Sequence, residues 1–282
     1  MTNAYQQTDT ILHVENVSVV YGAKTIIENI SFTEKNTVRP NAQQGQTIAF
    51  LGRSGRGKST LFRVITGLEK PTSGRILIPD YNKPINETGQ PAKPVAEGDV
   101  GFVNQRYTLF RHKTVYQALM FALRKSTDSE AEKQNKVLQY LADWGLEKVK
   151  NQYPNELSGG QRQRTAILEQ LLSSGYYMVL DEPFSGLDVG NIESVKKAFH
   201  LITSSHELNT IVFSTHDIEL AVELADSIYV MGYASSPNDD LKQVGTIVGH
   251  FDLKAMNLSW AGTFDARHAE CAKAIKAAML AS

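Results

Sequence analysis

The sequence predicts an α/β fold in which helices join the strands of a buried parallel sheet. Residues 47–51 form a short apolar run, followed by a glycine-rich loop and then by apolar residues at helical spacing. Residues 177–180 form a second apolar run that ends in two carboxylates. Between residues 161 and 211 helical and strand patterns alternate, which indicates parallel strands connected by crossovers.

The regions around these strands predict further elements. Residues 11–78 alternate short strands and turns, and the segment includes the loop and the helix that follows it. The apolar positions of that helix are Leu61, Phe62, Val64, Ile65 and Leu68. Residues 114–144 show helical spacing and predict a helical lobe. Its apolar positions are Val115, Leu119, Phe121, Leu123, Val137, Leu138 and Leu141.

The glycine-rich loop runs from Gly52 to Ser59 and matches the pattern G-x-x-x-x-G-K-[ST] in full. Glycine lets backbone N–H groups turn inward without a Cβ clash, so such a loop can surround phosphate groups. Lys58 would contact the β- and γ-phosphates, and Ser59 would ligate Mg²⁺. An ordinary glycine-rich turn is the alternative, but the flanking strand and helix favour phosphate binding. The residues expected to bind nucleotide here are Gly52, Arg53, Ser54, Gly55, Arg56, Gly57, Lys58, Ser59 and Thr60.

Two carboxylates follow the second buried run. Asp181, at the C-terminal end of this strand, is placed to hold the Mg²⁺ shell. Glu182 follows directly and would orient and deprotonate an attacking water, as a general base does. Without other motifs, two acids at the end of a strand would be interpreted as a pair that faces solvent. Because a phosphate loop precedes them in the chain, a catalytic role is favoured.

A third motif, residues 157–161, reads Leu-Ser-Gly-Gly-Gln and leads directly into a helical pattern. Its serine and glycines predict a turn with free backbone N–H groups. The N-terminus of a helix attracts anions such as a terminal phosphate.

Together these motifs resemble those of the ATP-binding cassette (ABC) ATPases. Leu157 to Gln161 is similar to the family signature, so Ser158, Gly159, Gly160 and Gln161 are expected at ATP. Tyr21 resembles the aromatic that stacks on adenine, and His216 resembles the histidine that senses the γ-phosphate. Gln105 resembles a glutamine that links Mg²⁺ and water to the membrane partner. Four further residues resemble the loop at the dimer interface: Ser185, Gly186, Leu187 and Asp188.

The resemblance implies a P-loop NTPase (RecA-like) core with an N-terminal antiparallel β subdomain and an α-helical subdomain that carries the signature. It implies catalytic roles for Glu182, His216, Lys58 and Gln105, with Mg²⁺ held by Ser59, Gln105 and Asp181. Two subunits, expected as a homodimer, would meet head to tail around two ATP molecules. A transmembrane permease would be the further partner, with a solute-binding protein where the system imports.

The expected domain organisation is a single cassette at residues 11–250 with its helical subdomain at about 106–160. Residues 79–99 are rich in proline and predict a surface loop without a helix or a central strand. Residues 227–248 suggest two strands around a polar loop at 235–240. The extension at 251–282 is expected to be helical, with one apolar face that packs on its own domain. That face comprises Phe264, His268, Ala272, Ile275 and Met279.

Composition agrees with a cytosolic enzyme, and the resemblance implies a peripheral location at the cytoplasmic face of the inner membrane. The chain of 282 residues carries 29 basic and 30 acidic residues, so no nucleic-acid partner is expected. The single cysteine, Cys271, fits a reducing compartment. No apolar run approaches the ~20 residues that span a bilayer, and the polar start has no signal-peptide core. The other chain of a transporter would span the membrane.

The expected function is ATP hydrolysis that drives a permease, in the direction of import. Residues 52–55, 67–69 and 71–74 are similar to those of nitrate, sulfonate and taurine importers. Residues 165–170 depart from the Ala-Arg-Ala-Leu that the family typically has, and residues 173–176 replace its usual proline. The alternatives are a soluble ABC ATPase that acts on a non-membrane partner, and an exporter or lipid-extraction ATPase.

Residues 106–113 combine an apolar pair with basic neighbours. Such a segment suits the docking of a short helix from a permease, and a solvated loop is the plain alternative.

Overall fold

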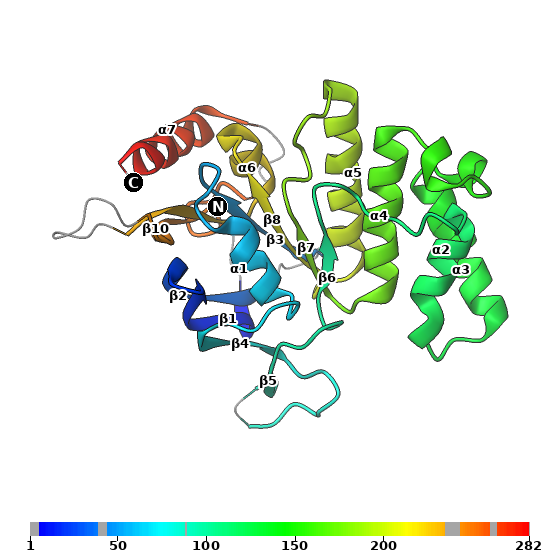
Figure 1. Cartoon of the computed structure of the whole chain (residues 1–282), viewed down its shortest axis with the longest axis horizontal. Helices are drawn as coiled ribbons and strands as arrows, with labels where there is room; N and C mark the ends of the chain where they lie inside the picture. The colour runs from blue at the N-terminus through cyan, green and yellow to red at the C-terminus, as the bar shows by residue number, and fades with distance from the viewer. Residues whose placement is uncertain (1–5, 39–43, 88, 235–242, 260–263, 282) are drawn as a thin grey trace.

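The computed structural model describes residues 6–38, 44–87, 89–234, 243–259 and 264–281. Figure 1 shows a body built around a twisted sheet, with a group of helices set to one side of it. The strands are β1 (Gln6–Tyr21), β2 (Lys24–Val38), β3 (Gln46–Leu51), β4 (Ser73–Pro79), β5 (Ala92–Pro94), β6 (Gly101–Val103), β7 (Tyr177–Leu180), β8 (Thr210–Thr215), β9 (Ser227–Tyr233) and β10 (Gly245–Asp252). The helices are α1 (Lys58–Ile65), α2 (Val115–Ala122), α3 (Glu130–Asp143), α4 (Gly159–Ser173), α5 (Val189–Ser205), α6 (Ile218–Leu224) and α7 (Ala266–Leu280), with short 3₁₀ turns at Leu123–Lys125, Glu147–Val149 and Pro154–Glu156.

Within the described residues the strands form one sheet in the order β5-β4-β1-β2-β10-β9-β3-β8-β7-β6. Strands β3, β8, β7 and β6 run parallel, and β9 joins β3 in the same direction. The pairs β1–β2, β1–β4, β4–β5 and β9–β10 are antiparallel. The predicted α/β class, with a parallel core and an antiparallel N-terminal part, is confirmed.

The central strand β3 explains why the sheet has two hydrophobic cores. All of its side chains are buried, and alternate residues face opposite sides because the side-chain period of a strand is two. Ala49 and Leu51 pack in the cluster that also holds α4, α5, α6 and the helical group. Ile48 and Phe50 pack in the other cluster, with α1 and the antiparallel strands.

The proline-rich segment contributes the outermost strand of the sheet. β5 pairs only with β4 among the described residues, and Pro94 lies opposite Leu77. Proline has no N–H to donate to a ladder, so it is tolerated at a sheet edge and excluded from a central strand. Residue 88 of this segment and the predicted polar loop at 235–240 lie outside the described residues.

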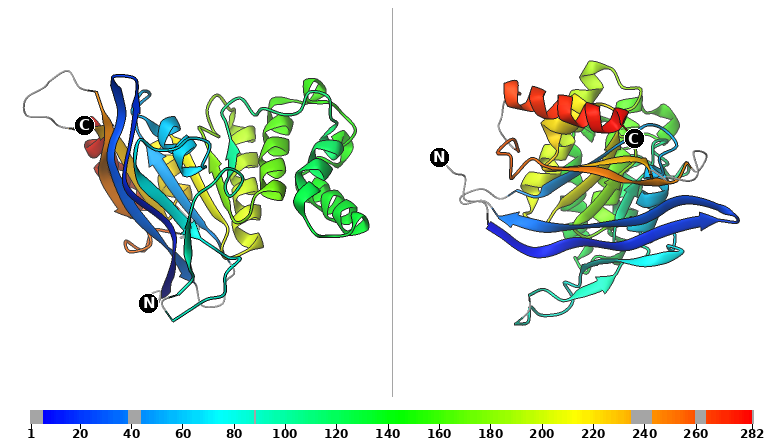
Figure 2. Two further views of the ribbon diagram at one scale, coloured as in Figure 1. Left: turned by 60° about the horizontal axis from the view of Figure 1, so that its bottom comes forward. Right: turned by 90° about the vertical axis from the view of Figure 1, so that its left-hand side faces the viewer.

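Figure 2 shows the long β1–β2 hairpin and α7 on opposite sides of the β9–β10 hairpin. The buried residues of α7 are His268, Cys271 and Ile275. His268 binds Asp265 through Nδ1 at 2.7 Å and the Leu258 carbonyl through Nε2 at 3.0 Å. Phe264, which the apolar pattern placed on the buried face, is 46% exposed because the chain only enters the helix after it.

Candidate functional site

The phosphate loop connects β3 to α1 and has the backbone that its glycines predict. Gly55 and Gly57 lie in the left-handed region, with φ values of 84° and 85°. Gly57 precedes the first residue of α1, and a Cβ at this position would overlap the Ile27 side chain. A side chain at Gly57 is therefore excluded both by the backbone conformation and by the space beside it.

The loop borders a cavity of about 480 Å³ that gathers most of the predicted site. The predicted nucleotide residues around it are Gly52, Ser54, Gly55, Arg56, Gly57, Lys58, Ser59 and Thr60. The predicted magnesium and catalytic residues around it are Gln105, Asp181, Glu182 and His216, and Ser185 and Ile26 complete the wall. Residues from five separate stretches of the sequence thus meet at one end of the parallel strands.

Lys58 is a buried residue that lines this cavity. Its Nζ donates to the Gly52 carbonyl at 2.6 Å and to the Arg53 carbonyl at 3.3 Å. It also lies 3.6 Å from Oε1 of Glu182. The ammonium and the carboxylate therefore face the same space, and the side chain of Lys58 is only 7% exposed.

The two acids after β7 are held by a serine of the neighbouring strand. Ser214 of β8 donates its hydroxyl to Oδ1 of Asp181 at 2.7 Å. The same hydroxyl oxygen accepts the backbone N–H of Glu182 at 2.9 Å. His216 lies 3.1 Å from Oε2 of Glu182 through Nδ1, while its side chain is 69% exposed.

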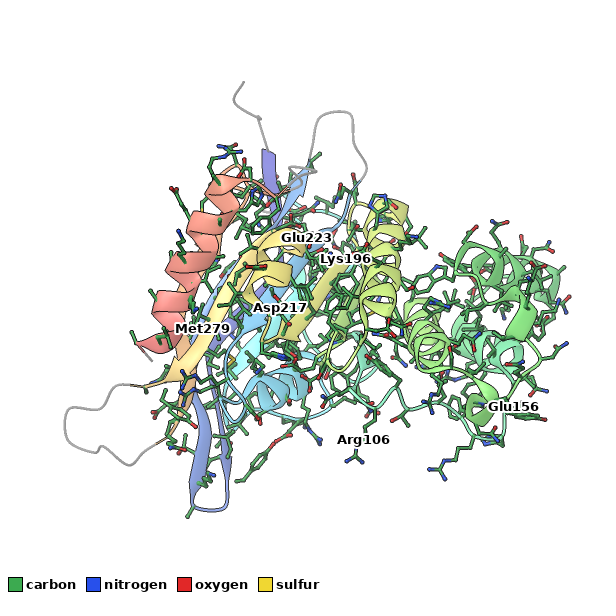
Figure 3. The ribbon with its side chains drawn as sticks, turned by 90° about the horizontal axis from the view of Figure 1, so that it is seen from above. Arg106, Glu156, Lys196, Asp217, Glu223 and Met279 are labelled. Atoms are coloured by element: carbon green, nitrogen blue, oxygen red, sulfur yellow. The ribbon has the colours of Figure 1, made fainter. Side chains whose placement is uncertain are left out.

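Gln105 and Ser185 meet at the mouth of the cavity. The Gln105 amide donates to the Ser185 hydroxyl at 3.3 Å, so the segment after β6 contacts the segment after β7. The next residue, Arg106, points away from the body of the protein (Figure 3) and is exposed. Figure 3 also shows Lys196 of α5 beside Glu223 of α6, an ion pair of 2.8 Å.

The signature residues lie outside this cavity in their own chain. Ser158 caps α4 by accepting the Gln161 N–H, and the Gln161 side chain accepts the Ser158 N–H in return. Gly160 is buried against Asn191 of α5, where a Cβ would overlap the asparagine side chain. Ser158 and Gly159 are exposed, so the start of α4 is open to a second molecule.

Other predicted residues also do not line the cavity. Tyr21 ends β1 and is 47% exposed, and a hydrogen bond with Glu69 raises the pKa of its phenol. Arg53 is exposed. In the predicted interface loop, Gly186 is exposed with a φ of 71°, and Asp188 caps α5 through the Asn191 N–H.

Three residues at this site were not predicted from the sequence: Ser214, Gln163 and Tyr107. Ser214 is a buried hydroxyl residue that directly follows three apolar residues of β8, which was a usable signal for a buried polar contact. Gln163 and Tyr107 both donate to the Pro183 carbonyl, directly after Glu182. No sequence pattern distinguishes these two from ordinary helix and loop residues.

Comparison with known proteins finds the ABC transporter family, whose model matches residues 36–185. A sulfate/thiosulfate import ATP-binding protein of Synechocystis sp. is 38% identical over 228 residues, which cover 78% of this chain and 60% of that protein. The corresponding protein of Thermosynechococcus vestitus is 37% identical, covering 86% of this chain and 66% of its own length. The chain thus spans about two thirds or less of these two relatives. A probable sulfate/thiosulfate import ATP-binding protein of Chlorella vulgaris is 36% identical, with 83% of this chain and 90% of that protein covered.

Solved structures show the same fold. A cbiO1 protein from Clostridium perfringens, described as part of an ABC transporter complex, superposes with a TM-score of 0.67 at 28% identity, covering 89% of this chain and 92% of that one. An ATP-binding cassette solved in its ADP conformation matches in fold, with a TM-score of 0.65 at 20% identity over 90% of this chain and 97% of that one. On the family match, the relatives and the fold, the chain belongs to the ABC transporter family.

Proposed function

We propose that this chain hydrolyses ATP as the energy-coupling subunit of a membrane transporter. One observation carries the proposal: the phosphate loop, Asp181, Glu182 and His216 line a single cavity, with Lys58 facing Glu182 across 3.6 Å. The family match and the names of the relatives support the same activity.

The residues present fit ATP with Mg²⁺. The left-handed glycines of the loop allow backbone N–H groups to turn toward a phosphate, and Lys58 lines the cavity as a buried cation. Ser59, Gln105 and Asp181 line the cavity and carry hydroxyl, amide and carboxylate oxygens, the ligand type that Mg²⁺ prefers. When bound, Mg²⁺ neutralises charge on the β- and γ-phosphate oxygens. Tyr21, an exposed residue at the end of β1, is proposed to stack on adenine.

Glu182 is proposed to accept a proton from the attacking water. A general base needs a carboxylate within hydrogen-bond reach of that water, and Glu182 is held at the cavity from three sides. Its N–H binds Ser214, its Oε2 meets His216, and its Oε1 faces Lys58. Lys58 would stabilise the negative charge that develops on the transferred phosphoryl group.

The site is proposed to be completed by a second copy of the chain in a head-to-tail homodimer. Ser158 and Gly159 stand exposed at the N-terminus of α4, away from their own cavity. In the dimer, Ser158 to Gln161 of one subunit would face the phosphates of the other, as a helix N-terminus attracts anions. Ser185 to Asp188 would lie at the seam, where Ser185 already touches Gln105.

The proposed membrane partner is a permease that docks on the helical subdomain at about 106–160. Phe110 and Phe121 pack edge to face at 5.3 Å and are both partly exposed. Lys113 and Arg124 lie over the Phe121 ring at 4.7 Å and 4.4 Å. This aromatic pair with cations suits a short amphipathic helix with an acidic end. Among the described residues no helix is long and apolar enough to cross a bilayer.

The direction of transport is proposed to be import, because the relatives are named as import proteins for sulfate and thiosulfate. The chain would then work at the cytoplasmic face of the membrane, with a solute-binding protein on the other side. Within the chain, residues 11–250 are proposed as the cassette, 79–99 as a surface segment and 251–282 as an extension of it.

The first test is hydrolysis by the purified full-length chain with ATP and Mg²⁺. Glu182→Gln is expected to lower turnover roughly 10²–10⁴-fold, the range for general-base catalysis, while ATP binding persists. The matched control is Glu219→Gln, an exposed glutamate on α6, which should turn over as the wild type does. Full turnover by Glu182→Gln would contradict the proposed base.

The transport role is tested by a pull-down of tagged Glu182→Gln protein from its native cells in mild detergent. A stoichiometric multi-span membrane protein supports the proposal, and a co-purified solute-binding protein supports import. Ribosomal or DNA-bound partners without a permease would contradict the transport role and leave the ATPase.

A further inference from the structure

The backbone beside Glu182 is held by two side chains that lie outside the cavity. The Pro183 carbonyl accepts a hydrogen bond from the amide of Gln163 and another, at 3.0 Å, from the hydroxyl of Tyr107. The two side chains therefore converge on one carbonyl oxygen and form one cluster with it. Pro183 and Gln163 are buried, which shields these bonds from water.

Glu182 needs such support because its backbone is unusual. Its φ is 51°, in the left-handed region that non-glycine residues rarely adopt. The Ser214 hydroxyl holds its N–H at 2.9 Å, and the Ser185 N–H donates to its carbonyl at 3.1 Å. The Pro183 carbonyl belongs to the very next residue. Strained backbone at a functional site persists only where its neighbours fix it, and here the hydrogen bonds hold the Glu182 backbone on both sides of its Cα.

The two donors come from segments that carry other parts of the site. Tyr107 follows Gln105 after β6, and its own φ of 47° is set by a turn in which its N–H donates to the Asn104 carbonyl at 3.0 Å. Gln163 lies in the first turns of α4, just after the signature residues. A shift of α4 or of the Gln105 segment therefore reaches Pro183 through a direct hydrogen bond.

We propose that Gln163 and Tyr107 are positioning residues for the catalytic base. They hold the Pro183 carbonyl and thereby keep the Glu182 carboxylate aimed into the cavity. This inference rests on the proposed function of Glu182.

The variants Gln163→Leu and Tyr107→Phe each remove one donor while keeping most of the packing. Turnover at saturating ATP and Mg²⁺ should fall roughly tenfold in Gln163→Leu and roughly threefold in Tyr107→Phe, as expected for losing one hydrogen bond each. The KM for ATP should stay within about twofold, because neither side chain lies on the cavity wall and uniform binding is retained. The double variant should be slower than either single one.

Two matched controls use the same substitutions at other positions, one on α4 and one on α3. Gln170→Leu removes the amide of a residue on the same helix, which binds the Phe102 N–H instead of Pro183. Tyr140→Phe removes the hydroxyl of a half-buried tyrosine on α3. Both should retain wild-type turnover. Melting temperatures of all four single variants show whether each protein is folded at the assay temperature.

A crystal structure of Gln163→Leu tests the same inference without turnover. The expected result is a Glu182 whose φ has left the left-handed region and whose carboxylate has moved from Lys58. An unchanged Glu182 together with wild-type turnover would overturn the positioning role. If Glu182→Gln is inactive while Gln163→Leu and Tyr107→Phe turn over normally, only this inference fails. If Glu182→Gln is active, the proposed function fails first.

Discussion

Glu169 of α4 is a buried carboxylate that the proposed reaction does not use. It is 9% exposed, and burial raises its pKa to about 7, although Arg124 opposes the shift. In the unfolded chain it ionises near its ordinary value, so between about pH 4.5 and 7 the folded state holds more protons. The stability that the protonated Glu169 side chain contributes is therefore fully present below about pH 4.5. It is lost as the pH rises through 7, because the buried carboxyl group then ionises.

Glu169→Gln should remove this pH dependence, because an amide has no charge to desolvate. At pH 8 we expect the variant to be more stable than the wild type by roughly 1–3 kcal/mol, and the difference should vanish near pH 4.5. Urea unfolding at pH 4.5, 6 and 8 measures it, with the exposed Glu219→Gln as control. Equal differences at all three pH values would show that Glu169 is not the group that titrates.

At the scale of elements, a buried polar cluster joins the two hairpins that flank the centre of the sheet. Tyr229 of β9 donates its hydroxyl to Oε1 of Glu34 on β2 at 2.7 Å. Lys254, just after β10, places Nζ 3.5 Å from Oε2 of the same carboxylate, and both charged side chains are at most 6% exposed. The segment after β10 is thus fixed to the antiparallel part of the sheet by one ion pair.

Lys254→Met should destabilise the protein by about 3–5 kcal/mol, because it leaves the Glu34 carboxylate buried without its cation. The double variant Glu34→Gln with Lys254→Met should recover much of this loss, since no charge then stays buried. Urea unfolding measures both, and Lys273→Met on the exposed side of α7 is the control. A Lys254→Met protein as stable as the wild type would mean that solvent reaches Glu34.

The same cluster shows which parts of the fold a sequence can predict. β3, the phosphate loop and α1 were predictable because the strand, the glycines and the helix are adjacent in the chain and each has its own local pattern. Glu34 and Tyr229 lie 195 residues apart, and a glutamate on a strand is usually solvated, so nothing local indicates their contact. Tyr107, Gln163 and Pro183 were missed for the same reason: their arrangement depends on how α4 packs against the segment after β7.

At the scale of the whole molecule, the proposed homodimer requires a site that two chains build together. Lys58 lies in the cavity, while Ser158 stands exposed at the start of α4 and outside the cavity wall. If each site combines the loop of one subunit with the signature of another, Lys58→Ala and Ser158→Arg damage different halves of it. Lys58→Ala removes the cation for the phosphates, and Ser158→Arg obstructs the neighbour's phosphates. Each variant alone should then be inactive.

Mixing the two inactive variants should restore hydrolysis, because every mixed dimer keeps one site built from an intact loop and an intact signature. For an equal mixture, about half of the dimers are mixed, so up to about a quarter of wild-type turnover should return. The assay is phosphate release after co-incubation with ATP and Mg²⁺, and differently tagged subunits verify that mixed dimers form. Doubling the concentration of either variant alone is the control. Turnover by Ser158→Arg alone would show that one chain completes its own site. Mixed dimers that form but do not hydrolyse ATP would show that the two chains do not share the site in this head-to-tail way.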